Sequence, residues 1–231
     1  MKHDYFVWNG VRSTAYNIFV TKQPPIMIPV ERVEYEEIEG RSGSIAITEG
    51  ERVYEDITLP VECWARHAGD MKAFLQMIRG AGKVAFPNRP EGYYKGRLNK
   101  PAEINRWYNT DARIFTLTFR CEPYLYIHGN HDITLRTAGY VQNHFNEDAL
   151  PIIRITGKGD IALSVNNRLI TMNSITSGIT LNSEIKEAYD GTKTMNLQVG
   201  GEYPILSPGK NAISWTGNVS SLVITPNWRM T

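Results

Sequence analysis

The sequence lacks the features that mark several classes of protein. It has only two cysteines, Cys63 and Cys121, in 231 residues, which excludes a disulfide-stapled secreted scaffold. Both lie in strand-like stretches, so we expect two reduced, buried thiols. No apolar run approaches the roughly 20 residues of a membrane helix, so we expect no membrane insertion. The first six residues lack the apolar core of a signal peptide, so we expect a soluble protein synthesised in a reducing cytoplasm.

An excess of charge of either sign is also missing. The formal net charge is +1, with 17 basic and 16 acidic side chains in residues 1–130 and 8 of each in residues 131–231. Neither half has the basic excess of a nucleic-acid-binding domain. The length suits one large or two ordinary domains, each with its own hydrophobic core.

Helical periodicity is scarce and occurs in one place, the first half of the stretch 69–97. Its apolar residues follow the i, i+3, i+4, i+7 spacing of one helical face. They are Met71, Phe74, Leu75 and Ile78. We expect Asp70 to cap this helix at its start, and Gly80 and Gly82 to end it. A helix this short must pack against a sheet to bury its apolar face.

The rest of the first 121 residues is strand-like. We expect strands over residues 5–9, 16–21, 31–39, 44–48, 52–64 and 112–121. Pro60 suggests an edge or a bulge. In the stretch 112–121 alternate residues share one face, namely Phe115, Leu117, Phe119 and Cys121.

The stretch 31–39 is unusual because it carries five glutamates. They are Glu31, Glu34, Glu36, Glu37 and Glu39. A Gly40-Arg41-Ser42-Gly43 turn connects this stretch to residues 44–48, which predicts a β-hairpin. Two interpretations stay open for its acidic surface: a solvated strand face, or a surface that nucleic acid passes without binding, because carboxylates repel phosphates.

The composition shifts near residue 122 toward Asn, Thr, Ser and Gly, and no helical period follows. Short apolar stretches recur at 152–156, 161–165, 168–171, 179–181, 212–215 and 221–224. Such spacing predicts a β-sandwich or jelly roll. We therefore expect a mainly β protein with an N-terminal domain over residues 1–129 and a C-terminal β-sandwich over residues 130–231.

Two motifs imitate sites of chemistry. The Gly129-Asn130-His131-Asp132 run matches one element of dimetal phosphoesterases, but the other ligand motifs of such a site are missing, which favours a turn between domains. The run 157–162 imitates a dinucleotide fingerprint, yet a strand and a turn follow where the fingerprint needs a helix. No acid–base pair or nucleophile arrangement is evident, so we expect no enzyme activity, no metal and no cofactor.

Four aromatic residues are candidates for exposure: Tyr93, Tyr94, Trp107 and Tyr108. Exposed rings can form a protein interface or a platform for sugars, whereas packing in the core or under a loop is the more common role. The sequence leaves both roles open.

In the order of its motifs, the chain resembles the distal tail proteins of long-tailed, non-contractile phages, which form the hub of the tail tip. The resemblance rests on residues 6–10, the turn 40–43, the helix with residues 86–94, and residues 151–155 and 226–229. It implies an N-terminal β-sandwich-like domain with one helix and one β-hairpin, and a galectin-like C-terminal β-sandwich. It also implies a hexameric ring of N-terminal domains around the tail channel, through which the genome passes without specific binding.

The resemblance implies partners and a location. The partners would be the tail tube protein, the end of the tape-measure protein, the tail-associated tip protein and receptor-binding proteins. The location would be the virion tail tip, after synthesis in the host bacterial cytoplasm. The candidate oligomer-interface residues are Glu34, Glu36, Glu37, Glu39, Arg41, Arg89, Tyr93 and Tyr94. The alternative function is binding of carbohydrate or a host surface by the C-terminal β-sandwich.

Overall fold

A computed structural model describes residues 4–48, 50, 52–100 and 102–231. The chain divides into two compact units, Met1–Leu125 with Thr231, and Tyr126–Met230. Each is described by itself below as unit 1 and unit 2. Both are built of β-strands, and the described residues include one α-helix, α1 (Met71–Met77). None of the described helices is long and apolar enough to span a membrane.

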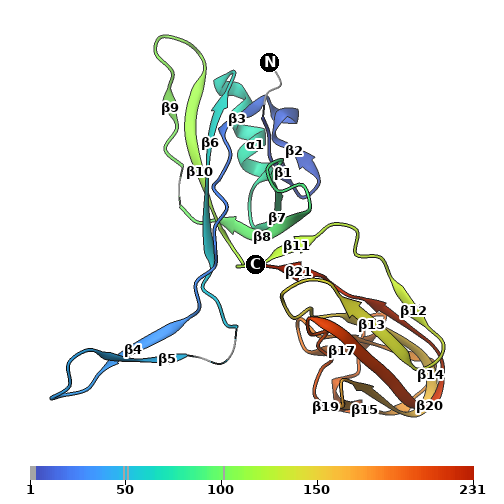
Figure 1. Cartoon of the computed structure of the whole chain (residues 1–231). Helices are drawn as coiled ribbons and strands as arrows, with labels where there is room; N and C mark the ends of the chain where they lie inside the picture. Colours follow the sequence, from blue (N-terminus) through green and yellow to red (C-terminus); the bar gives the residue numbers. More distant parts are fainter. Residues whose placement is uncertain (1–3, 49, 51, 101) are drawn as a thin grey trace. The chain divides into compact units, whose positions relative to one another are not determined.

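Unit 1 is organised around one antiparallel sheet with the strand order β2-β1-β7-β8-β10-β6-β3 (Figure 1). The strands are β1 (Val7–Trp8), β2 (Val11–Arg12), β3 (Ile18–Lys22), β6 (Ile57–Ala65), β7 (Ala81–Ala85), β8 (Gly92–Leu98) and β10 (Arg113–Cys121). A short strand, β9 (Asn105–Arg106), pairs with the start of β10. The predicted strand over 16–21 begins only at Ile18, because Ser13–Tyr16 form a 3-10 turn, η1.

The central pair β6–β10 confirms the alternation predicted for residues 112–121. The strand predicted over residues 52–64 was wrong at its start, because β6 begins only at Ile57. Its register runs from Arg113 opposite Ala65 to Cys121 opposite Ile57. The inward residues are all buried, namely Ile57, Leu59, Val61, Cys63, Phe115, Leu117, Phe119 and Cys121. Both thiols are free, as predicted, and burial raises the pKa of each to about 12. Pro60 pairs with Thr118 of β10, while the β3 pairing starts only at Glu62, so Pro60 occupies a local edge.

Helix α1 packs its predicted apolar stripe onto the sheet. Met71, Phe74 and Ile78 are buried, and the Phe74 ring lies 6.2 Å from that of Phe6 and 6.1 Å from that of Phe115. The sequence-based assignment of both helix ends was wrong in part. Asp70 has helical backbone angles and its side chain does not cap the helix, because a capping residue needs extended angles to reach the first-turn N–H groups.

Gly82 does not end the helix either. The helix stops at Met77, Gly80 turns the chain with a φ of +79°, and Gly82 already belongs to β7. A Cβ at Gly82 would lie 2.5 Å from the Trp8 ring. Glycine is therefore needed there for close packing of the sheet against Trp8 rather than for a helix stop.

Unit 2 is a β-sandwich-like unit built from one nine-stranded antiparallel network (Figure 1). Its strands are β12 (Ile133–Leu135), β13 (Gly139–Asn143), β14 (Ile152–Val165), β15 (Arg168–Ile175), β16 (Gly178–Asn182), β17 (Glu187–Asp190), β18 (Lys193–Thr194), β19 (Val199–Gly201) and β20 (Gly209–Thr225). A further 3-10 turn, η3, spans Asn196–Gln198. Two short strands, β11 (Leu125–Ile127) and β21 (Arg229–Met230), also pair.

Two long strands replace the pairs of short strands that the sequence predicts. The stretches 152–156 and 161–165 are both in β14, and 212–215 and 221–224 are both in β20. The register of β14 shifts within residues 156–162; its first half pairs with β16 and its second with β15. Strands that bend at bulges can serve two layers of a sandwich, and the buried residues of both halves form one core.

Candidate assembly surface

The predicted β-hairpin is present and forms a sheet of its own. Its strands are β4 (Val33–Glu37) and β5 (Ser44–Thr48), with Val33 opposite Thr48 and Glu37 opposite Ser44. Within the described part of the chain no third strand joins them (Figure 1). The turn between them places Gly40 and Gly43 at φ values of +80° and +81°, where glycine is favoured.

The hairpin is anchored at its base. The Arg32 N–H donates to the Val53 carbonyl at 2.8 Å, and the Glu55 N–H donates to the Val30 carbonyl at 2.9 Å. The Arg32 guanidinium also lies 3.1 Å from the Glu55 carboxylate. The stem is therefore tied to the segment that leads into β6, while β4 and β5 pair only with each other among the described residues.

All the predicted interface residues of the hairpin are exposed, namely Glu34, Glu36, Glu37, Glu39 and Arg41. Apolar residues are exposed beside them: Tyr35 by 71%, Ile47 by 45% and Ile45 by 36%. A two-stranded hairpin in water is at best marginally stable without a surface to pack on. Exposed isoleucines and a tyrosine therefore favour a partner-binding role over a purely solvated face.

The turn between β7 and β8 holds Arg89 within its own unit. Arg89 Nε donates to Glu91 Oε1 at 2.6 Å, and only 13% of the Arg89 side chain is exposed. The pKa of Glu91 lies below its usual value, chiefly because its own backbone N–H hydrogen-bonds the carboxylate; burial opposes this, and Arg89 lowers the pKa further. Arg89 thus stabilises the turn that precedes β8.

The adjacent tyrosines point to opposite faces of β8. Tyr94 is 4% exposed and belongs to the core, and burial raises the pKa of its phenol. Tyr93 is half-buried, with Lys83 Nζ 4.8 Å from the centre of its ring. Because neighbouring residues of a strand alternate between faces, only Tyr93 remains a candidate for contact with another subunit.

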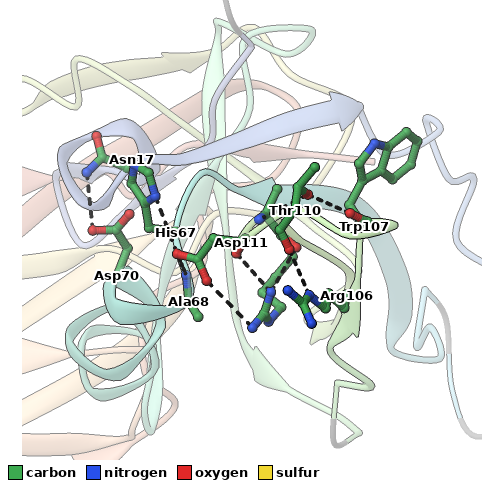
Figure 2. A network of polar contacts seen from close by, with 10 residues as sticks. Asn17, His67, Ala68, Asp70, Arg106, Trp107, Thr110 and Asp111 are labelled. Atoms are coloured by element: carbon green, nitrogen blue, oxygen red, sulfur yellow. Dashed lines mark hydrogen bonds and ion pairs between the residues drawn. The ribbon is translucent and has the colours of Figure 1, made fainter.

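The loop between β9 and β10 presents the other two aromatic candidates. Trp107 is 47% and Tyr108 80% exposed, and their rings meet edge to face at 5.2 Å. Figure 2 shows how polar contacts hold this loop: Thr110 N–H donates to the Trp107 carbonyl at 3.1 Å. Arg106 Nε donates to the Thr110 carbonyl at 2.9 Å. The Tyr108 ring is therefore not packed in the core.

The same network ties the loop to the start of the helical segment. The Asp111 carboxylate accepts a hydrogen bond from the Ala68 N–H at 3.3 Å and lies 3.4 Å from His67 Nδ1 (Figure 2). On the other side of this turn, Asn17 donates to Asp70 Oδ1 at 3.2 Å. Asp70 therefore links η1 to α1 in place of the expected helix cap.

The two motifs that imitate chemistry have structural roles. Asn130 accepts a hydrogen bond from the Trp228 N–H at 2.8 Å and donates to the Ile127 carbonyl at 3.1 Å, while Asp132 pairs with Arg154. The run 157–160 lies inside β14 and continues as a strand, so no helix N-terminus is available for a phosphate. Among the residues that the structure describes, no group of three or more His, Cys, Asp or Glu side chains is placed to hold a metal ion.

The fold of the whole chain matches that of phage tail components. The Dit protein of phage SPP1, described as a hub of the adsorption apparatus in phages that infect Gram-positive bacteria, matches with a TM-score of 0.72 and 15% identity, over 97% of this chain and 99% of that one. The activated phage P2 baseplate with Ca matches with a TM-score of 0.51 and 10% identity, over 100% of this chain and 99% of that one.

The corresponding baseplate structure with Sr matches with the same TM-score and identity, over 97% of this chain and 98% of that one. No protein-family model and no curated protein sequence matches the chain. At these identities the likeness establishes a shared fold, and it extends through both units.

Proposed function

We propose that this chain is a structural hub of a phage tail tip, which forms a ring through unit 1 and joins the tail tube to the tip and host-adsorption proteins. The observation that carries the proposal is the end-to-end match to the SPP1 hub protein, at a TM-score of 0.72 and without a large insertion in either chain. A fold by itself does not imply function. Two further observations support a structural role: the hairpin is exposed, and the sequence shows no catalytic grouping.

The hairpin is the element most suited to ring formation. It carries exposed apolar side chains and unpaired strand edges, which natural proteins use to bind a neighbouring chain. When two different patches of identical chains contact each other, each chain is rotated relative to the next. The chains close into a ring when these rotations add up to a full turn. A hexamer around the channel, with the acidic hairpin as a candidate for its inner side, is the form that we propose.

The partners follow from this location. The ring would contact the tail tube protein and the end of the tape-measure protein on one side, and the tail-associated tip protein and receptor-binding proteins on the other. The galectin-like assignment of the C-terminal domain belongs to the same proposal. The glycan-binding alternative has less support, because the solved structures that the chain resembles are described as a hub of an adsorption apparatus and as a baseplate.

The test is deletion of residues 34–44 with a short Gly-Ser connection in their place. We expect the wild-type chain to form a ring, measured as mass by light scattering and as a closed ring with a central hole in negative-stain images. The deletion should reduce the mass to that of a monomer while the circular dichroism spectrum stays that of a folded β protein. A deletion variant that still forms the ring would contradict the role of the hairpin.

A further inference from the structure

Unit 1 carries a row of apolar and aromatic side chains on the side of its sheet that faces away from the core. Phe19 of β3 lies opposite Trp64 of β6, and Trp64 lies opposite Ile114 of β10. Asn105 of β9 continues the row on the other side of Ile114. The next residue back along β6, Cys63, is buried in the core. Because successive residues of a strand point to opposite faces, the row faces outward.

Trp107, from the loop after β9, turns this row into a groove. One hollow of about 310 Å³ is lined by Thr21, Trp64, Trp107, Ala112 and Ile114. A second hollow of about 600 Å³ adjoins it, since Thr21, Trp107 and Ile114 line both. Both volumes lie within the range of about 300–1,000 Å³ that is typical of small-molecule sites. We name the two hollows together the tryptophan groove.

The tryptophan groove is apolar in its smaller hollow and polar in its larger one. The larger hollow adds side chains that form hydrogen bonds, namely Glu62, Lys100, Glu103, Asn105, Thr116 and Thr118. Its charges nearly balance, because Lys100 stands beside two carboxylates and Lys22 Nζ lies 3.5 Å from Glu62 Oε1. Aromatic rings next to balanced hydrogen-bonding groups suit an uncharged ligand that has both an apolar face and many hydroxyl groups.

Hydrogen bonds within the chain fix the backbone that carries the Trp107 ring. The Trp107 N–H donates to the Ala112 carbonyl at 3.0 Å, and the Trp107 carbonyl accepts from the Thr110 N–H at 3.1 Å (Figure 2). Asp111 ties the same loop to the Ala68 N–H at 3.3 Å. Trp107 is nevertheless 47% exposed. An exposed ring on a fixed backbone loses little conformational freedom when a ligand binds, which favours affinity.

We propose that the tryptophan groove binds a neutral saccharide. The C–H face of a pyranose ring would stack on the Trp107 indole, whose ring face is apolar and slightly negative. Sugar hydroxyl groups would form hydrogen bonds with Asn105 and Glu103 in the larger hollow. An apolar segment of a protein partner fits less well, because it would remove water from these polar groups without replacing the hydrogen bonds. The site lies in unit 1 and does not depend on ring formation.

Calorimetric titration of the full chain with cellohexaose and with chitohexaose tests the assignment, since both are neutral and present C–H faces. We expect at least one of them to bind with a Kd of about 1 mM or tighter. Trp107→Ala should weaken that binding at least about tenfold, and Trp107→Phe should recover part of the affinity because a phenyl ring keeps an apolar face. In saturation-transfer NMR, the ring C–H protons of the sugar should receive magnetisation from the wild-type protein, and Trp107→Ala should reduce this transfer.

Tyr108→Ala is the matched control. Tyr108 is exposed on the same loop but is not among the described residues that line either hollow, so its loss should change the affinity less than about twofold. The inference is overturned if neither saccharide binds with a Kd below about 10 mM, or if Trp107→Ala binds as wild type does.

Light scattering of the same variants separates this inference from the proposed function. We expect Trp107→Ala to form the ring as wild type does. A Trp107→Ala chain that loses the ring, together with a wild-type chain that binds neither saccharide, would make the tryptophan groove a contact between copies and overturn the saccharide site. A wild-type chain that binds a saccharide but forms no ring would contradict only the ring-forming function.

Discussion

At the residue scale, the clearest lesson comes from the glycines that let unit 1 pack closely. Gly82 and Gly96 lie opposite each other in β7 and β8, on the inward side of the sheet. A Cβ at Gly96 would lie 2.6 Å from the Arg120 carbonyl oxygen and 2.6 Å from Cys121 Sγ. Glycine is required at this position because β8 and β10 leave no room for a side chain.

Gly96→Ala should therefore destabilise the protein. The added methyl group meets backbone that cannot move without breaking the β8–β10 pairing, and such overpacking typically costs about 1–3 kcal/mol. The free energy of unfolding, measured by urea titration, should fall by that amount. Gly69→Ala is the matched control, because a Cβ there meets no atom within 4 Å, and it should change the free energy by less than about 0.5 kcal/mol. Equal effects of the two substitutions would contradict the packing argument.

At the scale of elements, helix α1 and the hairpin show opposite relations to the rest of unit 1. The helix spans seven residues, too short to be stable by itself; it persists because Phe74 enters an aromatic cluster with Phe6 and Phe115. No such packing covers the hairpin in the part of the chain that the structure describes, and its strands leave apolar side chains exposed. The helix is thus completed within the chain, whereas the hairpin leaves apolar side chains exposed, and we propose that a partner covers them.

Phe74→Ala should be among the most destabilising substitutions in unit 1. The side chain is fully buried, and truncation of a buried phenylalanine costs about 3–5 kcal/mol through lost burial and the cavity left behind. Gln76→Ala on the exposed side of the same helix should have little effect. Thermal unfolding followed by circular dichroism measures both, and a change in melting temperature of the same size for the two variants would show that α1 does not anchor the core.

At the scale of the whole molecule, the two units have separate cores. The unit 2 core is made only of residues from its own strands and connections, with Leu163, Ile153 and Met172 fully buried within it. A unit with its own core is expected to fold independently. Ring formation is proposed for unit 1, so the two units should be separable in both stability and assembly.

A fragment of residues 126–231 should fold cooperatively and stay monomeric. Its core is intact after the cut, and it lacks the hairpin. Residues 1–125 should form the ring that we propose for the full chain. Light scattering and urea unfolding of the two fragments check this. If the 126–231 fragment self-associated as strongly as the full chain, the assignment of ring formation to unit 1 would be wrong.

The elements that depend on local order were predictable from the sequence. The alternation in residues 112–121, the apolar stripe of α1, the glycine turn of the hairpin and the buried thiols all appear in the structure. Each depends on the fixed side-chain periods of strand and helix or on the backbone freedom of glycine. The sequence also contains few cysteines, no long apolar run and no excess of charge. These features argued against a disulfide-rich scaffold, a membrane-spanning protein and a nucleic-acid-binding domain.

Tertiary structure decided what depends on pairing between distant strands. Bulges join stretches of unit 2 that look like separate short strands into β14 and β20. In unit 1 the local sequence around Tyr93 and Tyr94 does not show which ring is buried, because that depends on which side of β8 the core lies. Likewise, the registers of β7, β8 and β10 place Lys83, Lys95, Arg97 and Arg120 on one side of the sheet, although they are remote in sequence. Register between strands remote in sequence is set by the packing of the whole sheet.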